Sequence, residues 1–189
     1  MKKDRWCQIK SDYLFLKEID TAFQKASMIV ASGSLPKGLP DTFYKELIEL
    51  ARRYEKPFML DTSGEPLKKA LEAGLVFIKP NLIEFEKLMG AEVKTEHDLV
   101  SILEKFPYPI PVIMVSLGEK GAIVKHYGKV YRVSISKVKA VNPVGSGDAV
   151  VAGYAAGLYQ GLKDEQLFKY SIVMGLLNAL ESQTGYVNT

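Results

Sequence analysis

The residues best suited to chemistry lie in one stretch near the end of the sequence, Val141 to Gly153. It holds three glycines, a serine and the carboxylate of Asp148, at a point where a strand-and-loop region gives way to a helix. Pro143 cannot donate to a strand ladder, so it ends any strand before it. Gly145 and Gly147 allow positive φ angles and leave room for another group beside the backbone.

A helix that begins at this loop would offer an anion site. Small and apolar residues recur at helical spacing from Ala149 to Leu158. The first N–H groups of a helix have no intrahelical partners and lie at the positive end of its dipole, so they attract phosphate or an oxyanion. Asp148 lies in the same turn, where a carboxylate is itself stabilised. The structural alternative is that Asp148 is a helix N-cap after a glycine loop.

Size and composition limit the class of protein. The chain has 189 residues, 47% hydrophobic and 25% charged, which predicts one globular domain with a substantial core. The net charge of +3 is spread over both signs and gives no argument for nucleic acid or an anionic membrane. The single cysteine, Cys7, excludes an internal disulfide and a cysteine zinc cluster. We expect a cytoplasmic protein in which His97 and His126 have surface roles.

Apolar runs and breaker residues predict strands that alternate with helices. The predicted helices are 12–26, 41–55, 65–73, 82–89, 95–106, 146–159 and 163–182, and the predicted strands are 27–31, 57–61, 75–78, 111–116, 121–127 and 130–135. This order predicts an α/β fold: a mostly parallel sheet with helices on both faces and an antiparallel hairpin toward the C-terminal half. Asp41 is the predicted cap of the second helix. The predicted buried side of the first helix is Leu14, Leu16, Ile19, Phe23 and Ala26.

Ligands of such sheets bind outside the carboxyl ends of the strands. The rim collects hydroxyls, an amide, a lysine, two carboxylates and two glycine turns, which suits an anionic ligand and a reacting group. Neither a G-x-x-x-x-G-K-[ST] loop nor a dinucleotide fingerprint after the first strand is present, which argues against those two classes of nucleotide site. The residues that the prediction places on this rim are Ser32 to Ser34, Asp61, Lys79 to Asn81, Ser116 to Gly118 and Gly145 to Asp148.

Four motifs follow one another at the ends of predicted strands. They are S-G-S-L-P-K-G at 32–38, K-P-N-L-I-E at 79–84, S-L-G-E-K-G at 116–121 and N-P-V-G-S-G-D at 142–148. Together they resemble the PfkB (ribokinase-like) family of carbohydrate kinases, in particular the branch of tagatose-6-phosphate kinase and 1-phosphofructokinase. The resemblance covers 27–188, so we expect a single partial ribokinase-like domain over 1–189, with 1–26 as an unassigned helical lead-in.

The resemblance implies a chemical role for the glycine loop. It implies ATP-dependent transfer of the γ-phosphoryl group to a sugar phosphate of the tagatose 6-phosphate or fructose 1-phosphate type. Asp148 would be the catalytic base that takes the hydroxyl proton. Gly145, Ser146 and Gly147 would form the anion hole for the transferring group.

The resemblance also implies contacts to the nucleotide. For the turn at 116–121 the structural alternative is a plain hairpin turn, and for Asn178 it is a polar residue on a helix flank. The apolar stripe Tyr154, Leu158, Phe168, Ile172 and Leu176 is interpreted as core and not as an adenine pocket. The candidate nucleotide contacts are Ser116, Gly118, Gly121, Asn178 and Lys79.

Asn81 and Glu84 are the candidate metal residues. They are three residues apart, so both side chains lie on one side of a helix turn. The resemblance implies that this pair helps to hold Mg²⁺, generally through water. The structural alternative is a capping Asn and a solvated Glu. Lys37 is a further candidate for a phosphate contact.

The chain departs from the family pattern before Ser32. The family has further strands, a G-G sugar motif and a small β-sheet lid in that region, whereas this sequence shows neither the G-G pair nor the lid strands. We therefore expect the nucleotide side of a kinase, weak or inactive alone, with an exposed sheet edge that favours self-association. The alternatives are a non-catalytic nucleotide-binding or association module derived from such a kinase, or a nucleoside- or pyridoxal-type kinase of the same fold.

Overall fold

A computed structural model of the protein describes residues 15–136 and 138–187. In these residues six strands form one sheet in the order of the sequence; β1 to β4 are parallel, β5 is antiparallel to β4, and β6 is antiparallel to β5. The α/β architecture and the antiparallel hairpin are confirmed. The strands are β1 (Ile29–Ser32), β2 (Phe58–Asp61), β3 (Phe77–Ile78), β4 (Val112–Ser116), β5 (Ala122–His126) and β6 (Lys129–Val133).

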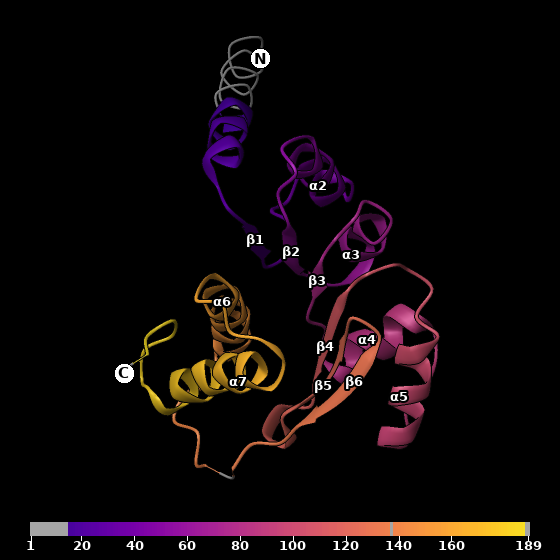
Figure 1. Ribbon diagram of the computed structural model, residues 1–189, viewed down its shortest axis with the longest axis vertical. Coiled ribbons are helices and arrows are strands. Elements are labelled where there is room, and N and C mark those ends of the chain that lie inside the picture. The colour runs from indigo at the N-terminus through magenta and orange to yellow at the C-terminus, as the bar shows by residue number, and fades with distance from the viewer. Residues whose placement is uncertain (1–14, 137, 188–189) are drawn as a thin grey trace.

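Helices cover both faces of the sheet. Figure 1 shows α2 to α5 on one side and the orange and yellow α6 and α7 on the other. Residues 15–25 are also helical. None of the helices in the described part of the chain has the length and apolarity of a bilayer span. The helices are α2 (Phe43–Arg53), α3 (Gly64–Ala70), α4 (Leu82–Met89), α5 (Glu96–Glu104), α6 (Ser146–Tyr159) and α7 (Asp164–Leu180), with a 3₁₀ turn, η1 (Gly118–Lys120).

The alternation of side chains along each strand divides the core in two. Phe58 and Leu60 of β2 pack with α2 to α5, whereas Met59 between them packs with α6 and α7. Successive residues of a strand point to opposite faces, so a sheet covered on both sides needs continuous apolar runs. Such runs are what the sequence supplies in β2 and β4.

The sheet begins at β1, which pairs only with β2 among the described strands. Val30 in β1 is 44% exposed, although it lies in an apolar run. The edge therefore presents unpaired backbone groups and an aliphatic side chain, as the sequence predicts. Self-association through it stays a prediction.

Two predictions about the first two helices are wrong. The N-cap position of α2 is Thr42, not Asp41, and the Thr42 hydroxyl bonds to Glu46 one turn on, at 2.9 Å. In the first helix Leu16 is 49% exposed, because the helix packs on the sheet near its end, where Phe23 lies edge-on to Phe58. Leu14 lies outside the described residues.

His126 lies in a packed environment and not at the surface. Its side chain is 12% exposed, its Nδ1 lies 3.3 Å from Asp164 Oδ1, and its ring stands edge-on to Phe168 at 5.1 Å. Burial lowers the pKa of His126 below its ordinary value of 6.5, and the Asp164 carboxylate partly opposes the shift. At neutral pH the ring is therefore an uncharged part of the contact between the hairpin and α7.

This packing predicts a pH-dependent stability. Because the folded-state pKa of His126 is below the unfolded value, the unfolded chain binds a proton first as the pH falls below about 6.5, and the free energy of unfolding decreases. Urea unfolding at pH 8 and pH 5.5 should show this loss in the native protein, and a smaller one in His126→Gln. The exposed His97→Gln is the matched control and should lose as much unfolding free energy between pH 8 and pH 5.5 as the native protein does. An equal loss in the native protein and in His126→Gln would contradict a lowered pKa of His126.

Candidate active site

The carboxyl ends of β1, β2 and β4 and the residues after β3 meet the start of α6. Ser32, Asp61 and Ser116 are the last residues of their strands, and Lys79 follows β3 directly. Asn81 forms an isolated parallel bridge with Ser116. The predicted rim is therefore one continuous polar edge of the sheet.

Asp148 is directed at this rim. Helix α6 begins at Ser146, with Gly145 in the N-cap position at φ 82°, and no side chain among the described residues caps it. Asp148 is the third residue of the helix, and its Oδ1 accepts a hydrogen bond of 2.5 Å from the Ser32 hydroxyl. The N-cap alternative is therefore wrong. The carboxylate contacts the end of β1. The Ser146 N–H donates to the Pro143 carbonyl at 3.2 Å, and the next N–H groups of α6 have no side-chain partner among the described residues.

Glycine is required at position 145 by its surroundings. An added Cβ would lie 2.6 Å from the Thr184 methyl carbon, and positive φ is itself strained for other residues. Asn142 donates from Nδ2 to the Ser182 carbonyl and to the Thr184 hydroxyl, both at 3.3 Å. The segment after α7 therefore packs against the glycine loop and fixes its position.

A buried ion pair lies beneath the first turn of α6. Lys79 Nζ lies 3.2 Å from Asp61 Oδ2, and the two side chains are 8% and 16% exposed. A Cβ added to Gly147 would lie 3.2 Å from Lys79 Nζ, a tight contact that the lysine end would have to relieve by a shift of a few tenths of an ångström. Burial raises the pKa of Asp61, Lys79 lowers it, and the nearby charges of Asp148 and Glu84 raise it further. The pair places one cation among three carboxylates next to the helix start.

Asn81 and Glu84 form a capping box at the start of α4. Asn81 Oδ1 accepts from the Glu84 N–H and Glu84 Oε2 accepts from the Asn81 N–H, both at 2.9 Å. The capping alternative is realised for Asn81, and Glu84 has one oxygen engaged by the same box. Within 15–136 and 138–187, no cluster of three or more His, Cys, Asp or Glu residues could hold a metal ion.

A cavity of about 420 Å³ adjoins the polar rim. One end is polar and includes Lys79, Asn81 and Ser116. Ser146 also lines it, and its hydroxyl oxygen is buried with no hydrogen-bond partner among the described residues. A buried polar atom without a partner is costly, so it marks a place where a ligand would supply the missing bond. The apolar end is lined by Ile135, Val138, Ala140, Val150, Ile172, Leu176 and Ala179.

The structure brings most of the predicted site residues together. Ser116, Gly118, Gly121, Lys79, Asn81, Ser146 and Gly147 line this cavity. Gly145 and Asp148 line a neighbouring cavity of about 520 Å³ that Met174 and Tyr186 help to form. Glu84 lies close enough to Asp61 to affect its ionisation.

Two predicted contacts lie elsewhere. Asn178 is fully buried and is not part of the cavity wall; its Nδ2 donates to the Tyr186 carbonyl at 3.1 Å. Its Oδ1 has no partner among the described residues and would lie 3.3 Å from a Cβ on Gly145. Lys37 is exposed and lines none of the cavities named above.

The apolar wall of the cavity escaped the sequence reasoning. The core interpretation is confirmed for Phe168 and Ile172, which are 1% and 8% exposed, but Ile172 also lines the cavity together with Leu176. Ala179, three residues after Leu176, continues the same apolar stripe. The length of this stripe was the sequence signal that could have indicated the cavity wall. The other wall residues, Ile135, Ser136, Val138 and Ala140, follow no periodic pattern that could have placed them.

Comparisons with known proteins identify the family of this chain. The pattern of pfkB family carbohydrate kinases matches residues 10–189. A tagatose-6-phosphate kinase from Staphylococcus epidermidis is 38% identical over 195 residues, which cover 100% of this chain and 62% of that protein. This chain therefore spans less than two thirds of the length of that relative.

Solved structures have the same fold. Phosphofructokinase-2 from Escherichia coli, in complex with fructose-6-phosphate, is 25% identical with a TM-score of 0.78, covering 87% of this chain and 55% of that one. Ribokinase from Arabidopsis thaliana, complexed with ribose and ATP, is 20% identical with a TM-score of 0.76, over 88% of this chain and 54% of that one, and shows the fold alone. Matched by the family pattern over nearly its whole length, the chain belongs to the pfkB family of carbohydrate kinases, a family of sugar kinase enzymes.

Proposed function

We propose that this chain carries the nucleotide side of an ATP-dependent phosphosugar kinase whose acceptor is of the tagatose 6-phosphate or fructose 1-phosphate type. One observation carries the proposal. The Asp148 carboxylate, in the first turn of a helix without a side-chain cap, is directed at the rim where Lys79 is buried. A base, a set of N–H donors and a cation next to one another are what phosphoryl transfer requires.

The proposed reaction uses these groups as follows. Asp148 accepts the proton of the acceptor hydroxyl, whose oxygen forms a bond to the γ-phosphorus. The bond from that phosphorus to the β–γ bridging oxygen breaks, and ADP leaves. The N–H groups around Gly147 and the Lys79 ammonium neutralise charge on the transferring oxygens. Ser32 holds the Asp148 carboxylate in place through its hydroxyl.

The cavity gives the proposed orientation of ATP. Its apolar end suits the adenine ring and its polar end suits the phosphates, next to Ser116, Gly118 and Gly121. The unpartnered Ser146 hydroxyl would bond to a phosphate oxygen. Asn178 does not line the cavity and lies next to Gly145 instead. Its predicted place near the adenine therefore has no support in the cavity wall.

The residues at the polar end also fit Mg²⁺ bound with the nucleotide. Mg²⁺ keeps several waters and binds proteins through one or two carboxylates together with substrate phosphates, so a closed protein cluster is not needed. Asn81 lines the cavity, and Glu84, its partner in the capping box, lies outside the lining with one carboxylate oxygen outside the box. When bound, Mg²⁺ would neutralise phosphate charge.

The second candidate, nucleotide binding without transfer, is favoured by one observation. The cavity is formed wholly by described residues between Lys79 and Ala179, whereas the reacting end lies beside the edge strand β1. The described residues can therefore form a whole nucleotide site without forming a whole site for the sugar phosphate. The two candidates share the nucleotide cavity and differ in the acceptor.

The test is ATP binding by calorimetry, with and without Mg²⁺, followed by ADP release with tagatose 6-phosphate, fructose 1-phosphate and fructose 6-phosphate. Saturable binding with transfer to a sugar phosphate supports the kinase. Binding without transfer supports the second candidate. Absence of binding overturns both.

A matched pair of variants assigns the binding to the cavity. Ala140 lines the cavity from an exposed loop, so Ala140→Trp should fill the adenine end and weaken ATP binding at least tenfold. Val141, the next residue, is 64% exposed and outside the lining, so Val141→Trp should bind as the native protein does. Equal affinity in both variants would place the nucleotide elsewhere.

A further inference from the structure

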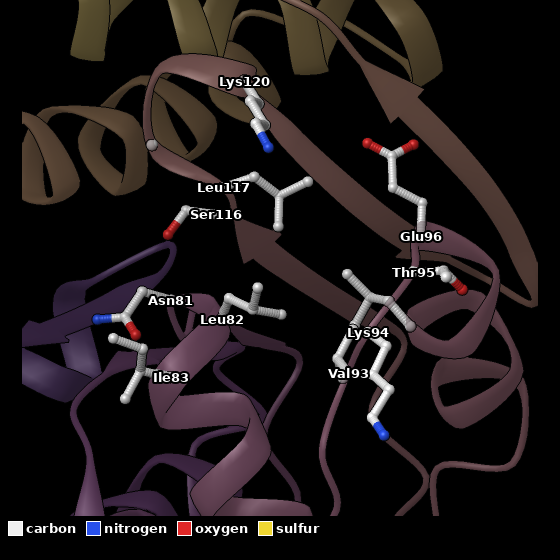
Figure 2. A pocket seen from close by; sticks show the side chains of 12 residues that line it. Asn81, Leu82, Ile83, Val93, Lys94, Thr95, Glu96, Ser116, Leu117 and Lys120 are labelled. Carbon is white, nitrogen blue, oxygen red and sulfur yellow. The ribbon is translucent and has the colours of Figure 1, made fainter.

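A separate cavity of about 430 Å³ lies between α4, α5 and the turn after β4. Figure 2 shows its walls: the start of α4 with Leu82, residues 93–96 before and at the start of α5, and residues 116–120. The volume is in the range of small-molecule sites. It shares only Asn81, Ser116 and Gly118 with the nucleotide cavity.

The two cavities open on different faces of the sheet. The walls of the first, beyond the shared residues, come from α4 and α5, which pack on one face. The nucleotide cavity is completed by α6 and α7, which pack on the opposite face. Apart from the three shared residues the two linings are different, and Lys120 belongs to the first cavity only.

The interior of this cavity is apolar. Leu99 lines it and is 1% exposed, and Leu82, Val93 and Leu117 are partly buried and pack against the core cluster that contains Leu99. Figure 2 shows Leu82, Val93 and Leu117 around the central space. Their aliphatic surface would gain from an apolar group placed between them.

The charge at the mouth is positive. Figure 2 shows the Lys120 ammonium directed inward, toward Leu117. None of the ion pairs among the described residues includes Lys120. Glu96, the one carboxylate in the wall, bonds to Arg132 Nε at 3.0 Å, and Lys94 pairs with Glu92 at 3.6 Å.

The start of α5 does not itself supply the anion site. The Thr95 hydroxyl accepts from the Asp98 N–H and Asp98 Oδ2 accepts from the Thr95 N–H, so the capping box already serves these donors. The Lys120 ammonium is the group that would meet an anion. An apolar base with a cation at its mouth matches a molecule with an apolar body and one negative end.

We infer that this cavity binds a small amphipathic carboxylate at the same time as a nucleotide occupies the other cavity. The carboxylate bonds to Lys120 and the apolar body packs on Leu82, Val93 and Leu117. The part about simultaneous occupancy depends on the proposed function, whereas the site itself does not.

The turn that carries Lys120 is held firmly enough to present it. Arg132 Nη1 donates to the carbonyls of Lys120 and Val133, each at 2.8 Å, and its Nε bonds to Glu96. A Cβ on Gly121 would collide with the Val133 carbonyl, so β6 lies tight against this turn. Strand β6 and the start of α5 thus fix both sides of the cavity mouth.

The test uses 4-phenylbutyrate as probe and methyl-labelled protein in NMR titrations. The probe should shift the methyl signals of Leu82, Val93, Leu99 and Leu117. It should do so equally when a non-hydrolysable ATP analogue with Mg²⁺ is saturating. The nucleotide should instead shift the methyls of Val150, Ile172 and Leu176, so failure of the proposed function would be seen separately.

Two controls test the charge. Lys120→Met keeps the aliphatic stem and should weaken the probe about fivefold or more while leaving nucleotide affinity unchanged. Lys105→Met changes an exposed lysine that lines none of the cavities and should have no effect. The neutral 4-phenylbutan-1-ol should bind weakly both to the native protein and to Lys120→Met. Displacement of the probe by the nucleotide, equal binding of acid and alcohol, or no shift at these methyls would each overturn the inference.

Discussion

Asp148→Asn is expected to lower the rate of phosphoryl transfer by about 10²- to 10⁴-fold and to leave the Kd for ATP within about twofold. Asparagine has nearly the same shape, and its Oδ1 still accepts from the Ser32 hydroxyl, so the first turn of α6 keeps its position. It cannot accept a proton from the acceptor hydroxyl. The measurement is ADP release with the preferred sugar phosphate, beside calorimetric ATP binding.

Ser32→Ala is the matched control for this variant. It removes the donor that holds Asp148 but keeps the carboxylate, so a smaller loss of transfer is expected. The same two measurements distinguish a chemical from a structural role. If Asp148→Asn lost ATP affinity and transfer to the same extent, the carboxylate would be part of the scaffold and the proposed reaction would be wrong.

The rim of the site was predictable because the rule that places it is local. Ser32, Asp61, Lys79 and Ser116 each follow an apolar run at the end of a strand, and parallel strands end at a common edge. The helix start at Gly145 was likewise readable from glycine followed by small, helix-spaced residues. A short-range pattern and one topological rule therefore gave the edge on which the candidate residues lie.

The pairing of groups on that rim was not predictable. Ser32 and Asp148 are 116 residues apart, and Asp61 and Lys79 come from different strand ends that meet beneath Gly147. No periodicity of the sequence encodes such contacts. The capping box of Asn81 and Glu84 shows the converse, because one three-residue spacing is compatible with both a helix cap and a cation site, and the structure shows the cap. The position of His126 was not predictable for the same reason. Its alternating strand indicates an outward side chain, but Phe168 of α7, which is distant in the sequence, packs against it.

The second large effect is expected at the buried ion pair. Asp61→Ala should lower the free energy of unfolding by about 3 kcal/mol, because it leaves the Lys79 ammonium buried without its partner. For a chain of this size that corresponds to a fall in Tm of about 6 to 12 °C. Thermal and urea unfolding at pH 7.5 measure the change.

Adding Lys79→Met should restore most of this stability, because the double variant buries no lone charge. Lys79→Met alone should cost less than Asp61→Ala, since burial already raises the pKa of Asp61 and the lone carboxyl can take up a proton. The exposed pair of Glu65 and Lys68 is the matched control, and Glu65→Ala should leave Tm unchanged.

The double variant also separates stability from function. It should be as well folded as the native protein and yet bind ATP more weakly, because the cation beneath Gly147 has gone. If Asp61→Ala were as mild as Glu65→Ala, or if the double variant were no more stable than Asp61→Ala, the ion pair would not support the start of α6. If instead the double variant bound ATP as tightly as the native protein, Lys79 would be a structural residue, and the charge that the transferring phosphoryl group needs would have to come from the helix N–H groups alone.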